Sequence, residues 1–128
     1  MGKLEFIGYQ LNEVLHIPYR LGQWNSGVEY PYSVGEITEE PTSTEDGYET
    51  SKLLITVFHR GDEAILDLEK VKEKIKKHFS PIYGLRAETE SGTIVIYYDG
   101  SFYVPTGEAD LKKIQINLSI KEWKGAVE

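Results

Sequence analysis

The run at residues 53–60, LLITVFHR, is apolar on both faces of the strand that it would form. Successive residues of a strand point to opposite faces. One face would carry Leu53, Ile55 and Val57, and the other Leu54, Thr56 and Phe58. A strand with two apolar faces belongs in the interior of a sheet. We therefore expect residues 49–60 to form a central strand.

A helical pattern follows this strand directly. Gly61 is expected to break the strand, and Asp62 can cap the next helix. Acidic residues gather near the start of this segment, whereas Lys74, Lys76, Lys77 and His78 gather near its end, which suits the helix dipole. Ser80-Pro81 ends the pattern. Apolar side chains recur at spacings of three and four: Ile65, Leu68, Val71, Ile75 and Phe79.

The remaining elements are an N-terminal helix and further strands. Residues 3–15 show a helical period in Leu4, Ile7, Leu11 and Val14, flanked by Phe6 and Leu15. Residues 28–37 alternate as a half-buried strand, in which Pro31 must face away from a neighbouring strand or lie at a bulge. Residues 112–123 alternate with Ile114, Ile116, Leu118 and Ile120 on one face.

Asp99-Gly100 is a strong two-residue hairpin signal. It predicts two short strands, at residues 93–98 and 101–104, joined by a tight turn. A further short strand is expected at residues 85–90. The whole pattern predicts one α+β domain over residues 1–128, with a mixed, mostly antiparallel sheet of four to six strands. The N-terminal helix and one long helix would pack on one face of it.

The composition of the chain excludes some classes of functional site and argues against others. The chain has 128 residues, no Cys and a net charge of −7. The absence of Cys excludes a disulfide framework, a thiolate metal site and a cysteine nucleophile. The acidic balance argues against binding nucleic acid through its phosphates. No signal peptide and no membrane-spanning run is visible, so we expect a protein made in the cytoplasm that does not enter a membrane.

The acidic residues concentrate in one segment. Residues 21–51 contain no Lys or Arg. Within them, residues 40–47 are rich in turn formers and are expected to form a mobile loop between two strands. The paired carboxylates could bind a hard cation, but the spacing of a calcium loop is missing, so solvated surface is the favoured interpretation. The pairs are Glu39 with Glu40 and Glu45 with Asp46.

No catalytic or cofactor-binding motif stands out. The three His residues, His16, His59 and His78, fall in a turn, at a strand end and at a helix end, without metal-ligand spacing. No phosphate-cradling glycine loop and no nucleophile elbow is present. An enzyme is therefore the least favoured class, and we expect no cofactor and no metal.

Several segments of the chain form one pattern. The first is Tyr30-Pro31-Tyr32-Ser33-Val34-Gly35-Glu36, followed by an acidic stretch with Thr44-Glu45-Asp46-Gly47. A strand ending Phe58-His59-Arg60-Gly61 and a Leu/Glu/Lys helix come next. The last is Tyr103-Val104-Pro105-Thr106-Gly107-Glu108, followed after two residues by Leu111 and then by a strand ending Lys121-Glu122-Trp123. These segments, over residues 30–123, resemble the tail terminator, or tail-to-head joining, proteins of siphophages and prophages.

The resemblance implies a structural virion component at the tail–head junction. Such subunits form a ring, usually a hexamer, that caps the tail tube and contacts a head-completion or connector protein. DNA would pass through the ring without specific binding. It implies no reaction. Tyr30 and Tyr32 are the candidate subunit interface, and Glu39, Glu40, Glu45 and Asp46 are the candidate acidic lumen or axial loop.

A second interpretation of the sequence stays open. The chain contains nine Tyr residues, several of them in the expected strands. A small, non-catalytic module that binds a ligand or peptide on a Tyr-rich sheet face would carry the same composition.

Overall fold

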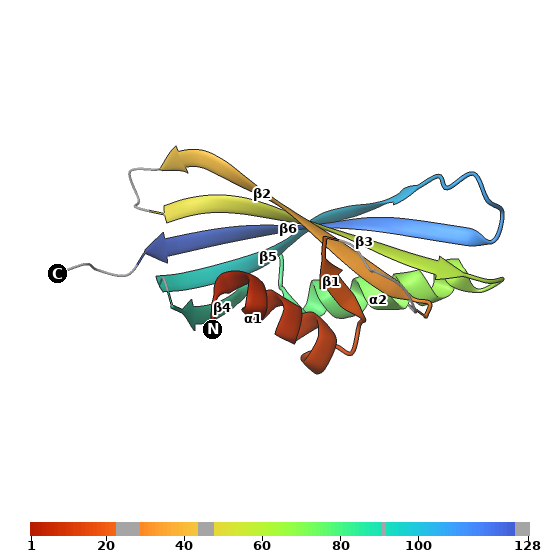
Figure 1. Ribbon diagram of the computed structural model, residues 1–128, viewed down its shortest axis with the longest axis horizontal. Helices are drawn as coiled ribbons and strands as arrows, with labels where there is room; N and C mark the ends of the chain where they lie inside the picture. The colour runs from red at the N-terminus through yellow and green to blue at the C-terminus, as the bar shows by residue number, and fades with distance from the viewer. Residues whose placement is uncertain (23–28, 44–47, 91, 125–128) are drawn as a thin grey trace.

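The computed structural model describes residues 1–22, 29–43, 48–90 and 92–124, without the side chains of residues 40–43. These residues form a twisted six-stranded sheet with helices on one of its sides (Figure 1). The helical elements are α1 (Lys3–Tyr9), its π-helical continuation η1 (Gln10–Val14) and α2 (Ala64–His78). The strands are β1 (Tyr19–Leu21), β2 (Tyr32–Ser43), β3 (Tyr48–Arg60), β4 (Leu85–Thr89), β5 (Gly92–Val104) and β6 (Leu111–Lys124). The predicted α+β class is confirmed.

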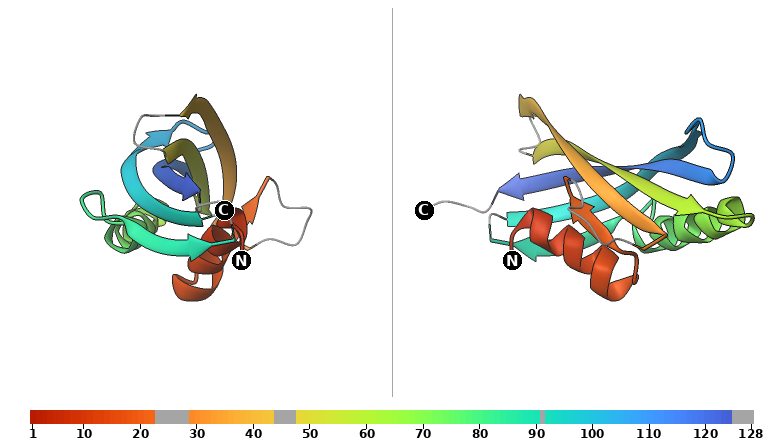
Figure 2. Two further views of the ribbon diagram at one scale, coloured as in Figure 1. Left: turned by 90° about the vertical axis from the view of Figure 1, so that its left-hand side faces the viewer. Right: turned by 45° about the vertical axis from the view of Figure 1, so that its right-hand side comes forward.

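The strand order is β1-β2-β3-β6-β5-β4. Only β1 and β2 pair in parallel, and every other neighbouring pair of the described sheet is antiparallel. β3 and β6 therefore occupy the middle of the sheet, as the two apolar faces of residues 53–60 predict. Two further views show how strongly the sheet twists (Figure 2).

The face of the sheet that α1 and α2 cover is called the inner face. On it, Val57 lies opposite Ile114, Ile55 opposite Ile116, and Leu53 opposite Leu118. All six side chains are fully buried. Against them α2 packs a buried row of Leu68, Val71 and Ile75, which Phe79 continues directly after the helix. These residues were expected in the core from their helical spacing, and that prediction is confirmed.

α1 and η1 are fixed to the sheet by apolar and polar contacts. Ile7 and Leu11 are fully buried. The Lys3 ammonium lies 3.3 Å from the carboxylate of Glu122, whose side chain is almost entirely buried on the inner face. A buried carboxylate needs such a partner, since an unpaired charge in the interior is costly. The Asn12 side chain also bonds the backbone N–H and C=O of Tyr19, at 2.8 and 3.0 Å.

The hairpin prediction at Asp99-Gly100 is wrong. The chain runs through this dipeptide as one strand, β5, with a register shift between Tyr98 and Ser101. Gly100 has a φ of 105°, which suits a bulge as well as a tight turn. The Asp99 carboxylate accepts a hydrogen bond of 2.8 Å from the Ser119 hydroxyl on β6. The dipeptide therefore bends a long strand instead of reversing the chain.

The boundary between β2 and the expected acidic loop also needs correction. β2 begins at Tyr32, after the cis Tyr30–Pro31 peptide, and continues to Ser43. Its backbone pairs Glu39 with Ser51, and a register shift follows that residue. Glu39 and the backbone of Glu40 thus belong to a strand, because pairing with β3 outweighs the turn-forming composition. Glu45 and Asp46 lie outside the described residues.

Two details of the predicted helices are wrong. Asp62 does not cap α2: the N-cap is Glu63, and no side-chain capping bond is present there. Leu4, Val14 and Ile65 are about two-fifths exposed, although their spacing placed them on the buried faces. Each lies near the end of a helical segment, where the helix reaches past the sheet that would cover it.

Replacing Leu68 or Ile75 by Ala should lower the free energy of unfolding by about 2–5 kcal/mol, because each substitution leaves a cavity between α2 and the sheet. Lys70→Ala, at an exposed position of the same helix, is the control and should change it by less than about 0.5 kcal/mol. Chemical denaturation measures all three. A small effect at both core positions would mean that this face of α2 is not in the core.

Two glycines face Tyr19, and replacing each by Ala should change the stability of the protein in opposite directions. A Cβ on Gly35 would lie 2.2 Å from the Tyr19 hydroxyl oxygen, whereas a Cβ on Gly8 would meet the same ring at 4.0 Å. Gly35→Ala should therefore destabilise the protein by about 1–3 kcal/mol through overpacking. Gly8→Ala should stabilise it by up to about 1 kcal/mol, since Gly weakens a helix. Thermal or denaturant unfolding measures both changes in stability. Equal effects at the two sites would contradict the packing of these glycines against the Tyr19 ring.

Candidate functional site

An aromatic cluster lies on the face of the sheet opposite the helices, here called the outer face. The Tyr32 and Phe58 rings stack, with centroids 5.0 Å apart and planes 18° apart. Tyr30 follows, with its ring centroid 5.4 Å from that of Tyr32. Register explains the stack, because Tyr32 and Phe58 are direct partners in the β2–β3 ladder. The structure thus brings the two predicted interface residues together and adds Phe58.

Arg60 ties this cluster to the loop between β5 and β6. Its guanidinium carbon lies 5.6 Å from the centroid of the Tyr30 ring. The same group bonds the carboxylates of Asp110 at 2.9 Å and Glu108 at 3.2 Å. A planar guanidinium can satisfy two carboxylates while it stacks on a ring. Three segments distant in sequence therefore meet at one end of the sheet.

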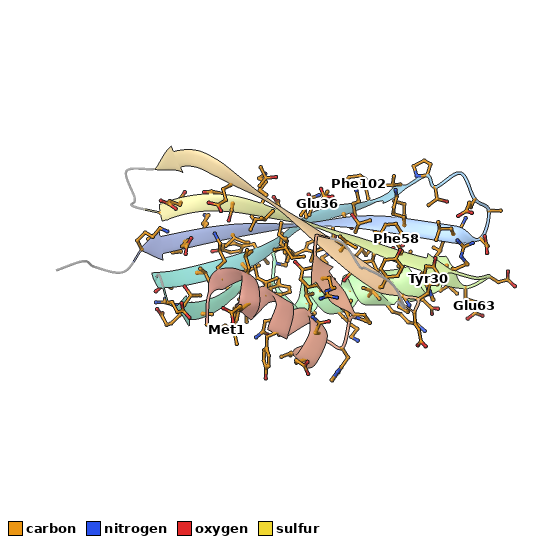
Figure 3. The ribbon with its side chains drawn as sticks, viewed as in Figure 1. Met1, Tyr30, Glu36, Phe58, Glu63 and Phe102 are labelled. Atoms are coloured by element: carbon orange, nitrogen blue, oxygen red, sulfur yellow. The ribbon has the colours of Figure 1, made fainter. Side chains whose placement is uncertain are left out.

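The cluster continues across the sheet toward β5. Lys113 of β6 is the register partner of both Phe58 and Val104, and its ammonium lies 5.8 Å from the Phe58 ring centroid. Phe102, also on the outer face, is half exposed. Figure 3 labels Tyr30, Phe58 and Phe102, which lie toward the same end of the sheet. We call Tyr30, Tyr32, Phe58 and Phe102 the aromatic patch.

The patch is apolar in its body and polar at its tips. Burial raises the pKa of Tyr32, and neighbouring Tyr30 raises it further, while Arg60 opposes the shift. The hydroxyl therefore stays protonated at neutral pH and can donate a hydrogen bond. Rings that combine a large apolar surface with one polar group are common at protein interfaces.

The opposite end of the outer face has its own aromatic group. Tyr48 and Trp123 are register partners with ring centroids 5.3 Å apart. The Lys121 ammonium lies 5.2 Å from the Tyr48 ring centroid and 5.6 Å from that of Tyr97. Polar side chains, among them Thr56, Gln115 and Asn117, separate this group from the aromatic patch.

The predicted acidic residues are not brought into the patch. Glu39 is exposed and is the eighth of the 12 residues of β2, far along the strand from Tyr32. The side chains of Glu40, Glu45 and Asp46 lie outside the described residues, so the structure leaves their arrangement as a prediction. Glu36 is exposed on the outer face, opposite Leu54 in the β2–β3 register.

The histidines make contacts that link elements of the fold. His59 Nε2 lies 2.8 Å from a carboxylate oxygen of Asp67, which joins the end of β3 to the first turn of α2. Its Nδ1 atom is buried and has no hydrogen-bond partner within the described part of the chain. His78 Nε2 lies 2.7 Å from Gln10 Oε1, and burial lowers the pKa of this imidazole. His78 is therefore neutral at pH 7 and links α2 to η1.

Among the described residues, no group of three His, Asp or Glu side chains is placed to hold a metal ion. No helix within the described ranges has both the length and the apolar character needed to cross a membrane. The interactions that the structure does bring together at the outer face are aromatic stacking, cation–π contacts and ion pairs. Such groups can bind another molecular surface.

Sequence reasoning missed Phe58, Arg60 and Phe102 as partners of Tyr30 and Tyr32. The alternating pattern predicted which of them share a strand face. It could not predict the strand order, which pairs β3 with β6 and places β5 on the other side of β6. The sequence did hold one signal for a partner of Arg60: Glu108 and Asp110 are the only acidic residues of the β5–β6 loop. The strands on either side of that loop are rich in aromatic side chains, in β5, and in Lys, in β6.

The sequence was also compared with known proteins. No family model matches the chain, and no curated protein matches it either.

Proposed function

We propose that this chain is a structural subunit of a phage tail, similar to the tail terminator proteins, that assembles with copies of itself into a ring. The proposal rests on one observation. Three of the segments that carry the resemblance meet at the aromatic patch, where Arg60 contacts Tyr30, Glu108 and Asp110. Segments that share one surface suit a common role at that surface.

The uncovered outer face supports an assembly role. A sheet with helices on one side presents its other side to solvent or to a partner. Here that side carries Tyr30 and Phe102, which are 42% and 51% exposed, beside the half-buried Tyr32 and Phe58. Aromatic rings of this kind supply most of the binding energy in many protein interfaces. In the proposed ring, the patch contacts a neighbouring subunit or the tail tube.

The other expected properties follow from the same proposal. The subunit catalyses no reaction and needs no cofactor. Its partners are a second copy of itself, the tail-tube protein and a head-completion or connector protein. It resides at the tail–head junction of the virion. The net charge of −7 suits a passage that DNA crosses without binding, and Glu39, Glu40, Glu45 and Asp46 would line that passage or its entrance.

Expressing the chain with the genes that flank it in its genome tests the proposal. We expect rings at the ends of tail tubes, and a released species of six times the 14.6 kDa chain mass by native mass spectrometry. Tyr32→Ser with Phe58→Ser should reduce ring formation, because both substitutions remove apolar contact area. Lys70→Ser, on the exposed face of α2, is the matched surface control. Circular dichroism verifies that each variant is folded.

A chain that stays monomeric beside fully formed tubes, with no density at the tube ends, would contradict the proposal. A monomer that instead binds small ligands or peptides through Tyr30 and Tyr32 would favour the binding-module alternative. Mass measurement and binding measurements on the same preparation separate these two outcomes.

A further inference from the structure

A short turn after α2 displays two large apolar side chains. Ile82 is 75% exposed and Tyr83 is 82% exposed, more than any other large apolar residue among those described. The turn that carries them, residues 80–84, projects beside the end of α2 at the left of the left-hand view in Figure 2. We call Ile82 and Tyr83 the apolar knob. Contiguous exposed apolar side chains often mark a site where another molecule binds.

The turn behind the knob is held in one conformation. The Ser80 hydroxyl accepts hydrogen bonds from the N–H groups of Ile82 at 3.2 Å and Tyr83 at 3.1 Å. The Gly84 N–H donates to the Ser80 carbonyl at 2.9 Å. Gly84 has a φ of 70°, and a Cβ there would lie 2.6 Å from Val95 Cγ1 on β5. A pre-ordered turn loses little conformational entropy when its side chains enter a binding site.

A pocket lies at the other end of α2. It has a volume of about 540 Å³ and is formed by the first turn of α2, the end of β5, the start of β6 and the loop between those strands. Much of its wall is apolar, with Ile65, Val104, Pro105, Ala109 and Leu111. Its size lies within the range of cavities that hold a drug-sized molecule, so it has room for the side chains of an Ile and a Tyr.

The pocket adjoins the aromatic patch. Val104 and Lys113 line the pocket, and Lys113 is also the register partner of Phe58. One pocket wall is fixed by the Tyr103 hydroxyl, which donates a hydrogen bond to Glu69 of α2. The loop wall is fixed by Arg60, through Glu108 and Asp110. The pocket and the patch thus form one continuous surface, and both are ordered before any partner binds.

Knob and pocket lie too far apart for one copy to fill its own pocket. The 15 residues of α2 separate them, which is about 22 Å at a rise of 1.5 Å per residue. A projecting apolar group and a matching hollow at different places on one chain favour a head-to-tail contact between copies. Repeating that contact closes a ring if the rotation between copies allows closure.

We propose that the apolar knob of one copy inserts into the pocket of the next copy, next to that copy's aromatic patch. This inference rests on the proposed ring-forming function and specifies its interface. Ile82 and the Tyr83 ring fill the apolar part of the pocket. The Tyr83 hydroxyl reaches the charged rim, where Glu108 can accept a hydrogen bond and Lys112 can donate one.

Cysteine cross-linking tests the contact directly, because the chain has no Cys of its own. Two batches are made, one with Tyr83→Cys and one with Ala109→Cys, distinguished by tags of different mass. Mixing them under mild oxidation should give the mixed disulfide about tenfold or more faster than mixing Lys70→Cys with Ala109→Cys. Lys70 is exposed on α2 and lies outside the proposed contact. The variant with both Tyr83→Cys and Ala109→Cys should give a covalent ladder that ends at the ring number.

Removing the knob supplies an independent measurement. Ile82→Ser with Tyr83→Ser should weaken self-association about tenfold or more in sedimentation experiments, as truncating central interface residues commonly does. The unfolding midpoint should stay within error of the original chain, because both side chains are largely exposed.

The outcomes separate this inference from the proposed function. Rings that form normally without the knob, with mixed disulfide at the control rate, would overturn the knob-and-pocket contact and leave the ring. Control-rate cross-linking in a chain that never assembles would overturn both. A series of disulfide-linked oligomers that grows past any fixed number of copies would support the contact and contradict the ring.

Discussion

The paired apolar rows of β3 and β6 are the interaction on which the rest of this structure depends. Val57, Ile55 and Leu53 face Ile114, Ile116 and Leu118 across the two central strands, and all are fully buried. Covering these rows requires α2, whose buried side chains lie at a spacing of three and four residues. α2 follows β3 in the chain and packs on the face that β3 forms with β6, so the helix and these two strands share one core. Most of the stability of the domain comes from this burial.

This one-sided core leaves the other side of the sheet free for a different use. Long strands hold aromatic and cationic side chains in fixed positions on the outer face, where Tyr32, Phe58 and Lys113 follow one register row. The same strands, with the start of α2, build the pocket, and the turn that ends α2 displays the knob. The proposed assembly surfaces are thus consequences of how the core is closed. A subunit of this kind is rigid where it is proposed to meet its neighbours.

Much of this fold could be predicted from local patterns. The two apolar faces of residues 53–60 predicted a central strand, and the period of α2 predicted its buried row; both are confirmed. The errors arose where pairing between distant strands decides the outcome. Asp99-Gly100 provides a positive φ, but β6 pairs on both sides of it, so the chain continues as a bulged strand. Glu39 likewise belongs to β2 because it pairs with Ser51.

The candidate site was less predictable than the fold. Tyr30 and Tyr32 stood out by composition, but Phe58 and Arg60 join them only through the register of β2 with β3 and the position of the β5–β6 loop. A cryo-electron microscopy structure of the assembled particle tests the account most directly. It should show a ring in which each neighbour covers the aromatic patch and the adjoining pocket. A particle in which Phe58, Phe102 and the pocket all face solvent would contradict the account.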